Sequence, residues 1–481
     1  MIALLAGAAT VLAFAPAGLY PLAWLTFAIL IHLLVRFPEK AFRTGFWFGL
    51  GLFGTGVSWV YVSLHVFGAM PAVLAGIATL VFCALLALFT GFATWLQARM
   101  PASDTARACL LIPAAWTLGE WLRSWLLSGF PWLSAGYAAA GWPLQGYAPL
   151  LGVLGMSFAT LSLAGVLWTS IYSKRRIILG SAFVAVIVVG EALRHVPWTQ
   201  PDGAPVRAAL LQGNVAQEMK FRPERYARIL ETYARLAEET SAALIVLPET
   251  ALPRFYDSVD PAYLARLEAA ARRNRGDLLL GVPYRTTPQD YYNSVVTLGS
   301  APRQLYHKRH LVPFGEFVPA GFSWALRLVD IPMSDFARGE RDAPPLEVAG
   351  QRVAANICYE DAFGDEIRRR AAPATLLVNL SNVAWFGDSL APAQHLQIAR
   401  LRAAETGRAY LTATNTGITA AIDRDGRVLA RLPQFTEGRL EIDAQGYSGA
   451  TPYVRFGDWP IVLISLFVLA AAAVMARRRH R

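Results

Sequence analysis

Long apolar runs with almost no charge fill the first part of the sequence and constrain its fold more than any other feature. Residues 2–192 form a succession of such runs, and residues 199–457 have an ordinary globular composition. Over the whole chain, 55% of residues are hydrophobic and only 16% are charged, which excludes an ordinary soluble protein. We therefore predict an N-terminal membrane domain at residues 1–195, a globular domain at residues 199–457, and a C-terminal transmembrane helix with a basic tail at residues 458–481.

Eight of the apolar runs are long enough, or nearly so, to cross a bilayer. A helix crosses the hydrocarbon core, about 30 Å thick, in about 20 residues. The runs lie at residues 2–19, 20–35, 44–66, 71–97, 108–128, 148–172, 176–193 and 459–476. The first could instead be a signal peptide, but no basic region precedes it and another apolar run follows at once, so a retained span is favoured. We expect about seven transmembrane helices before the globular domain and one after it.

Basic residues lie in alternate connections between these runs. They follow the second, fourth and sixth runs: Arg36, Lys40, Arg43, Arg99, Arg107, Lys174, Arg175 and Arg176. Another basic cluster, at residues 477–481, follows the last run. Because short cytoplasmic loops collect Lys and Arg, both termini are predicted to be cytoplasmic. The globular domain is then on the outer side of the membrane.

The net charge of +10 does not indicate a nucleic-acid-binding protein. Much of the excess lies at the predicted membrane edges, where it orients the chain or meets anionic lipid. The three cysteines do not indicate a disulfide framework, because Cys83 and Cys109 lie within predicted spans. Cys358 is thus expected to be a free thiol in the globular domain.

Short apolar runs alternate with helical patterns in the globular domain. Strands are predicted at residues 206–211, 243–247, 277–282, 294–298, 353–357, 375–380 and 409–413, and helices at 223–240, 260–275 and 392–407. This order is typical of an α/β fold in which helices cover a central sheet. The sequence contains no glycine-rich phosphate loop and no metal-ligand spacing above noise, so neither a cofactor nor a metal is expected.

Three strand ends carry residues that can do chemistry, and one of these residues follows a shorter run than the strands predicted above. Glu249 follows the run Leu244-Ile-Val-Leu-Pro, Lys308 follows Leu305-Tyr-His, and Cys358 follows Val353-Ala-Ala-Asn-Ile. Neighbouring strand ends converge on one edge of a sheet, so an acid, an amine and a thiol can meet there. A cysteine in an apolar strand is by itself more often a core residue. The acid and the amine together favour a nucleophile.

These residue types suit acyl transfer. A cysteine thiol has a pKa of about 8.5 and needs a base or a nearby cation to supply thiolate. A positive group must then stabilise the oxyanion that forms at the acyl carbon. Glu249 is predicted to be the base, Lys308 the oxyanion partner and Cys358 the nucleophile. The backbone N–H that follows Cys358 is a natural second donor.

The chain carries an ordered set of motifs, each weak alone but specific together. They are Trp116-Thr-Leu-Gly-Glu-Trp-Leu-Arg123, Gly129-Phe-Pro-Trp132, Leu211-Gln-Gly-Asn214, Leu247-Pro-Glu249-Thr, Tyr306-His-Lys308-Arg-His-Leu-Val-Pro-Phe-Gly-Glu316, Cys358-Tyr-Glu360, Asn379-Leu-Ser-Asn382, Ala384-Trp-Phe-Gly387 and Thr414-Asn-Thr-Gly417. The motifs of the globular domain resemble those of the nitrilase superfamily, which uses a Glu, Lys, Cys triad on an αββα sandwich. Over nearly its full length, the chain resembles the bacterial apolipoprotein N-acyltransferase family.

This resemblance implies the same triad roles and adds three supporting residues. Glu316 would orient the lysine or shuttle protons, and Tyr359 and Glu360 would shape the acyl pocket and its surroundings. One position departs from the family. A tryptophan often follows the lysine equivalent to Lys220, whereas Phe221 stands here, so a role that needs an indole N–H does not carry over.

The resemblance also implies a reaction and its partners. Cys358 would take an acyl chain from a phospholipid such as phosphatidylethanolamine and form a thioester. The α-amine of a diacylglyceryl-cysteine apolipoprotein would then attack that thioester. The protein would be a monomer in the bacterial inner membrane, with a periplasmic catalytic domain and no nucleic-acid partner.

Apolar residues near the site are predicted to contact lipid. Exposing an acyl chain to water costs about 0.8 kcal/mol per CH₂, so the site must open at the bilayer surface. The candidates lie after Lys220, in the apolar stretch 312–336 and around residue 385. Together with the polar residue Asn382, the predicted substrate- or lipid-binding residues are Phe221, Phe314, Phe317, Trp324, Trp385 and Phe386.

Several alternatives remain open on the sequence. A membrane-anchored amidase would share the triad but release the acyl group to water, and a transporter or receptor would place charged residues throughout the spans. Glu120 and Arg123 could form a structural pair or contact a lipid headgroup. His395 is expected to be a polar face residue of its helix.

Overall fold

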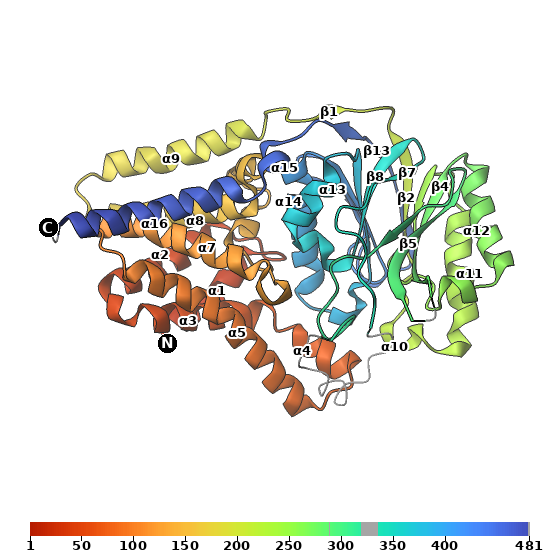
Figure 1. Cartoon of the computed structure of the whole chain (residues 1–481), viewed down its shortest axis with the longest axis horizontal. Helices are drawn as coiled ribbons and strands as arrows, with labels where there is room; N and C mark the ends of the chain where they lie inside the picture. Colours follow the sequence, from red (N-terminus) through yellow and green to blue (C-terminus); the bar gives the residue numbers. More distant parts are fainter. Residues whose placement is uncertain (288, 319–334, 480–481) are drawn as a thin grey trace. The chain divides into compact units, whose positions relative to one another are not determined.

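The computed structural model of the chain describes residues 1–287, 289–318 and 335–479 (Figure 1). The chain forms two compact units. The first contains Met1–Tyr61, Ala72–Pro197 and Thr451–Arg481, and the second contains Val62–Pro71 and Trp198–Ala450.

The first unit is helical. Its main helices are α1 (Ile2–Thr10), α2 (Pro21–Arg36), α3 (Ala41–Gly56), α5 (Ala72–Ala98), α7 (Ile112–Arg123), α8 (Ala148–Tyr172), α9 (Arg176–Leu193), α15 (Pro452–Phe456) and α16 (Trp459–Arg479). Each predicted apolar run contains one of these helices, although the run at 44–66 stops being regular helix at Gly56.

Several helices of this unit are apolar enough to cross a membrane. Among the described residues, three pass by length and composition: Ala72–Ala98, Pro143–Tyr172 and Arg176–Leu193. The pair Pro21–Arg36 and Pro38–Gly56, bent by 111°, would add a fourth if it is one broken span. Apolar helices at Ile2–Ala13 and Trp459–Met475 are shorter. The number of crossings, like the three domain boundaries, stays a prediction.

Glycines allow helices α3 and α5 to pack closely. Gly45 and Gly49 lie four residues apart on α3, and a Cβ at Gly49 would come within 2.1 Å of Thr90 Oγ1. Thr90 Oγ1 donates a hydrogen bond to the Gly45 carbonyl at 2.9 Å. Small residues at this spacing are a common way for apolar helices to associate without a hydrophobic driving force from water.

The second unit contains two six-stranded sheets. The first has the order β13-β2-β3-β4-β5-β6 and the second the order β12-β11-β10-β9-β8-β7. The strands of the first sheet are β2 (Val206–Gln212), β3 (Leu244–Val246), β4 (Asp277–Arg285), β5 (Tyr291–Gly299), β6 (Leu305–His307) and β13 (Gly438–Ala444). Those of the second are β7 (Leu346–Val348), β8 (Gln351–Ile357), β9 (Leu376–Ser381), β10 (Ala409–Thr414), β11 (Ala420–Ile422) and β12 (Val428–Arg431). The short strands β1 (Gln200–Pro201) and β14 (Tyr447–Ser448) pair with each other.

The sheets and helices form four layers, the αββα sandwich expected from the resemblance. Along β2, Leu210 joins the apolar cluster between the two sheets, whereas Leu211 joins a cluster with helices α11 (Pro223–Glu238) and α12 (Pro261–Arg273). Along β9, Val378 joins the first of these clusters and Leu377 a third, with α13 (Gly364–Ala371) and α14 (Ala391–Thr406). Figure 1 shows α11 and α12 outside one sheet and α13 and α14 outside the other.

Local sequence sets the ends of the covering helices. Pro223 and Pro261 stand in the first turns of α11 and α12, where the missing N–H has no cost. The Asp260 side chain caps α12 by accepting from the Ala262 N–H. Helix α14 ends at Thr406 and is capped by Gly407, whose φ of 62° favours glycine.

A short segment from between α3 and α5 belongs to the sandwich unit. Within Val62–Pro71, the Ser63 hydroxyl donates to the Trp385 carbonyl at 2.8 Å, and the Phe67 ring meets the Trp385 ring edge to face at 6.2 Å. The sandwich unit is therefore built from two separate stretches of sequence.

The layer between the sheets should dominate the stability of this unit. Leu376, at the start of β9, is completely buried there, whereas Leu429 on β12 is 52% exposed. We expect Leu376→Ala to lower the free energy of unfolding by about 2–5 kcal/mol, because it leaves a cavity. The matched Leu429→Ala should change it by less than about 0.5 kcal/mol. Denaturant unfolding followed by tryptophan fluorescence would measure both, and equal effects would contradict the four-layer core.

Candidate active site

The three predicted catalytic side chains lie at strand ends, as the sequence indicated. Glu249 follows β3, Lys308 directly follows β6 and Cys358 directly follows β8. Their exposed fractions are 6%, 1% and 8%. The first two come from one sheet and the thiol from the other, so the site forms where the ends of both sheets meet.

Lys308 lies between two carboxylates. Its Nζ is 2.9 Å from Glu316 Oε1 and 3.5 Å from Glu249 Oε1. Asn293 Nδ2 donates to the same two oxygens, at 2.7 Å to Glu249 and 2.8 Å to Glu316. Burial by itself would lower the pKa of the Lys308 amine, but Glu316 and Glu249 outweigh it and the pKa is well above its ordinary value. The lysine is therefore a fixed ammonium ion.

Backbone N–H groups also hold Glu249 and Glu316 in place. The Asn382 N–H, just past the end of β9, donates to Glu249 Oε2 at 2.8 Å. The Val312 N–H donates to Glu316 Oε2 at 2.9 Å. Each carboxylate thus has one oxygen directed at Asn293 and Lys308 and the other anchored to the main chain, which fixes both acids before any substrate binds.

The Cys358 thiol sits on a strained turn. Cys358 has a φ of 56°, a left-handed conformation that side-chain-bearing residues seldom adopt. Its carbonyl accepts a hydrogen bond from Asn379 Nδ2 at 2.8 Å. Burial and the nearby Glu249 raise the pKa of the thiol, and the Lys308 ammonium only partly offsets them. At neutral pH the resting group is therefore a thiol and not a thiolate.

Glu360 joins the turns that carry Cys358 and Lys308. Fully buried, it accepts hydrogen bonds from the Ile357 N–H at 2.7 Å, the Arg309 N–H at 2.8 Å and the His310 N–H at 3.1 Å. The Tyr306 hydroxyl also donates to it, at 2.8 Å. Each of these donors lies within two residues of Lys308 or Cys358 in the sequence.

Tyr359 and His395 lie beside the same turn. The Tyr359 hydroxyl donates to the Leu311 carbonyl at 3.1 Å, and the Lys308 ammonium lies 5.9 Å from its ring centre. His395 is not a polar face residue of its helix, because it is 5% exposed and pairs with Asp361 at 2.9 Å. Burial would lower the pKa of His395, but Asp361 raises it above its ordinary value.

The sequence did not predict that Asn293 and Lys220 lie beside Glu249, or that Asp361 pairs with His395. Asn293 lies within an apolar strand and gave no signal of its own. Lys220 belongs to the short helix α10 (Gln217–Lys220) and is 2% exposed, with Nζ 3.3 Å from the Glu249 carbonyl oxygen. The sequence showed a lysine at position 220, a few residues after Gly213 and Asn214. It did not show that this lysine is buried or which way its side chain points.

The predicted lipid-contact residues lie in different settings. Phe221 and Phe314 are exposed, Phe317 is half-buried, and Trp385 and Phe386 are half-buried in the turn beside Phe67. Asn382 lies inside the site instead, where its side chain bonds Gln217 and Asn415. Trp324 lies outside the described residues.

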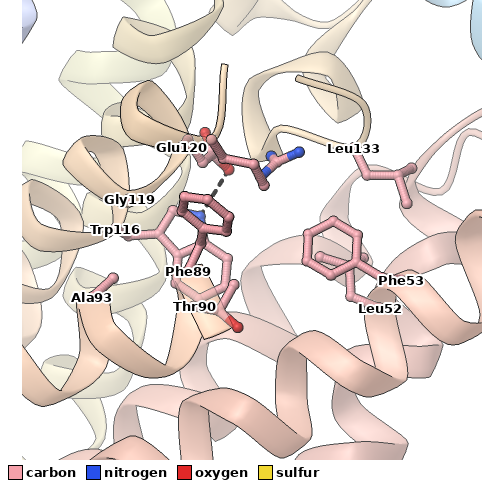
Figure 2. A pocket seen from close by; sticks show the side chains of 10 residues that line it. Leu52, Phe53, Phe89, Thr90, Ala93, Trp116, Gly119, Glu120 and Leu133 are labelled. Atoms are coloured by element: carbon pink, nitrogen blue, oxygen red, sulfur yellow. Dashed lines mark hydrogen bonds between the residues drawn. The ribbon is translucent and has the colours of Figure 1, made fainter. Parts of the chain in front are cut away.

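Glu120 and Arg123 hold a turn in the helical unit and do not pair within 4.0 Å of each other. Glu120 Oε1 accepts from the Trp116 indole N–H and the Ala135 N–H, both at 2.8 Å. Arg123 donates to the carbonyl oxygens of Phe130 and Trp132. Figure 2 shows Glu120 and Trp116 on one wall of a small pocket, with Phe53 and Leu133 on the other. The hydrogen bonds of Arg123 therefore join the motif at residues 116–123 to the motif at residues 129–132.

Known proteins resemble the chain over both units. Residues 6–166 match the apolipoprotein N-acyltransferase N-terminal domain, and residues 207–453 match the carbon-nitrogen hydrolase domain. A relative described as an apolipoprotein N-acyltransferase from Nitrosomonas europaea is 48% identical over 98% of this chain and 97% of its own. The chain belongs to the apolipoprotein N-acyltransferase family. It is an enzyme of the nitrilase superfamily, and the helical unit makes it a membrane protein.

A second relative agrees with this family. A relative from Ralstonia nicotianae with the same description is 43% identical over 100% of this chain and 93% of its own. Among solved structures, an amidase from Nesterenkonia sp. is 21% identical, covers 53% of this chain and 94% of its own, and has a TM-score of 0.37.

The raised pKa of Cys358 predicts an unusual pH dependence of alkylation. A group whose pKa lies above its ordinary value gains its anionic, reactive form only as the pH rises through that higher pKa. We expect the iodoacetamide rate at Cys358, followed by peptide mass spectrometry, to rise about tenfold per pH unit beyond pH 9. Lys308→Met should slow it further at each pH, because the ammonium lowers the pKa of the thiol. A rate that levels off below pH 8 would contradict a resting thiol.

Proposed function

We propose that the chain transfers an acyl chain from a phospholipid to the N-terminal amine of a diacylglyceryl-cysteine apolipoprotein, through a thioester on Cys358. The observation that carries this proposal is the buried cluster of Cys358, Glu249 and a permanently charged Lys308 in a member of this family. Glu249 acts as general base, Lys308 stabilises the oxyanion, and Glu316 orients the lysine.

In the first half-reaction, Glu249 takes the thiol proton as Cys358 Sγ attacks the ester carbonyl of the donor. Negative charge moves to the carbonyl oxygen, where the Lys308 ammonium and the N–H after Cys358 stabilise it. The carbon–oxygen bond then breaks, and Glu249 returns its proton to the departing glycerol oxygen. The products are a lysophospholipid and the Cys358 thioester.

A resting thiol suits this step. Since the thiolate would form only as the sulfur attacks, the site holds no free thiolate that could react with other electrophiles before the lipid binds. Glu249 would have to act within the reaction itself, which is why its two oxygens need fixed partners. In the second half-reaction the acceptor amine attacks the thioester and the sulfur leaves with a proton.

Finer assignments are also part of the proposal. Phosphatidylethanolamine is the donor, the protein is a monomer, and it lies in the inner membrane with a periplasmic sandwich unit and cytoplasmic termini. The alternate basic connections after residues 35, 97 and 172 support this orientation. Exposed Phe221 and Phe314 would contact the acyl chain or the bilayer surface.

Intact-protein mass spectrometry tests the thioester. Purified protein incubated with phosphatidylethanolamine should gain the mass of one acyl chain, which neutral hydroxylamine removes. Cys358→Ser should gain no such adduct, and Glu249→Gln should form it at least about 10²-fold more slowly, because a positioned base contributes about that factor. An adduct that forms normally on Cys358→Ser would overturn the mechanism.

Two controls sharpen that experiment. Cys109→Ser removes a thiol of the helical unit and should leave the adduct unchanged. Adding a diacylglyceryl-cysteine peptide should then convert the adduct into an N-acylated peptide. If free fatty acid appears at the same rate with and without the peptide, the chain is a hydrolase and not an acyltransferase.

Labelling from outside the cell tests the orientation. Asp443 and Lys174 are both exposed, one on the sandwich unit and the other between α8 and α9. In cells with a permeabilised outer membrane, a membrane-impermeant maleimide should label Asp443→Cys at once and Lys174→Cys only after lysis. The reverse pattern would place the sandwich in the cytoplasm.

A further inference from the structure

Lys220 is a second lysine buried in the catalytic cluster, and its surroundings differ from those of Lys308. It is 2% exposed, yet among the described residues no carboxylate oxygen lies within 4.0 Å of its Nζ. Its one hydrogen bond there goes to the Glu249 backbone carbonyl at 3.3 Å. Burying an unpaired ammonium is costly, so a lysine in this position is more readily kept as a free amine.

The reactive groups lie within electrostatic reach of this amine. Burial lowers the pKa of Lys220 to about 8, and Glu249, together with Cys358 whenever it is ionised, acts in the opposite direction. A pKa lowered in this way leaves part of the Lys220 population neutral near physiological pH. Lys308, by contrast, stays charged because two carboxylates hold it.

The second half-reaction needs a proton acceptor that the triad does not supply. The acceptor's α-amino group has an ordinary pKa of about 7.7–8.0, so it arrives largely as an ammonium ion. It must lose one proton before it can attack and a second one as the amide forms. Glu249 can pass the second proton to the departing Cys358 sulfur. The first proton requires another base beside the thioester.

We propose that Lys220 is that base and takes the first proton from the acceptor ammonium. The inference rests on the proposed thioester mechanism. The Lys220 amine becomes an ammonium ion, and the acceptor becomes a neutral amine that attacks the thioester carbonyl. The carbon–nitrogen bond forms and the carbon–sulfur bond breaks, Glu249 moves the remaining proton from nitrogen to sulfur, and Lys220 later releases its proton to water. A hydrolase, whose acceptor is neutral water, would have no use for this group.

Separating the two half-reactions tests the role of Lys220. The acyl-enzyme is first formed from phosphatidylethanolamine, and its reaction with a diacylglyceryl-cysteine peptide is then followed from pH 6.5 to 9.5. We expect Lys220→Met to form the acyl-enzyme within about threefold of the wild-type rate. Its kcat/KM for the peptide should fall about tenfold at pH 7 and recover above pH 9, where the acceptor is already neutral.

Two comparisons separate proton transfer from a simple need for charge. Lys220→Arg keeps a positive charge but cannot accept a proton, so it should lose as much activity at pH 7 as Lys220→Met. Hydroxylamine is largely uncharged at neutral pH and should cleave the thioester of both variants at the wild-type rate. The exposed lysine variant Lys174→Met should behave as wild type throughout.

Different results would contradict the role of Lys220 and the thioester mechanism on which it rests. Restored transfer in Lys220→Arg, a loss that does not change with pH, or an acyl-enzyme that fails to form in Lys220→Met alone would overturn the role of Lys220. If the wild-type protein forms no acyl-enzyme, the thioester mechanism itself is wrong. Acyl-enzyme formation also shows that each variant is folded.

Discussion

The hydrogen bonds to the Glu360 carboxylate are the interactions on which the site most depends. This buried acid has no cation within 4.0 Å in the described part of the chain, and it is stabilised instead by backbone N–H groups and the Tyr306 hydroxyl. Removing such an acceptor would leave several buried donors unsatisfied at about 1–3 kcal/mol each. Because its donors flank both Lys308 and Cys358, one side chain fixes the spacing between the Lys308 ammonium and the Cys358 thiol across two sheets.

The charges of the cluster explain why the site holds a thiol. Lys308 contributes one positive charge and Glu249 and Glu316 two negative ones, so the carboxylates already neutralise the lysine before a thiolate forms. An additional anion on Cys358 is disfavoured until a substrate carbonyl can share its charge. In the proposed reaction, the Lys308 ammonium therefore remains available to stabilise the oxyanion. The low-dielectric surroundings strengthen this electrostatic interaction.

The sequence predicted seven of the twelve strands in the two sheets and a candidate triad, but not the contacts between the elements. The central strands were predicted because they are apolar runs of strand length, and Glu249, Lys308 and Cys358 became candidates for the triad because they follow such runs. The edge strand β13 was missed because its residues are only half-buried and carry charges that pair with Arg207. The positive φ of Cys358 has no sequence signal, since the surrounding hydrogen bonds impose it.

The sequence also could not predict the direction in which buried polar side chains point. Asn293 lies in a strand with two buried faces, so alternation does not reveal which neighbours it meets. His395 lies on a helix whose residues are buried on nearly all sides, and there a polar residue gives no sign of a solvent face. Both positions depend on pairing between elements that are far apart in the chain.

The placement of Val62–Pro71 in the sandwich unit has a practical consequence. The chain passes between the two units four times, at Tyr61, Pro71, Pro197 and Ala450, and not only at the two ends of the carbon-nitrogen hydrolase domain. A fragment cut at residues 198 and 450 would lack the Ser63 and Phe67 contacts and uncover the Trp385 turn. Such a fragment would be an incomplete fold with a new apolar surface, prone to aggregate even though Glu249, Lys308 and Cys358 are all present.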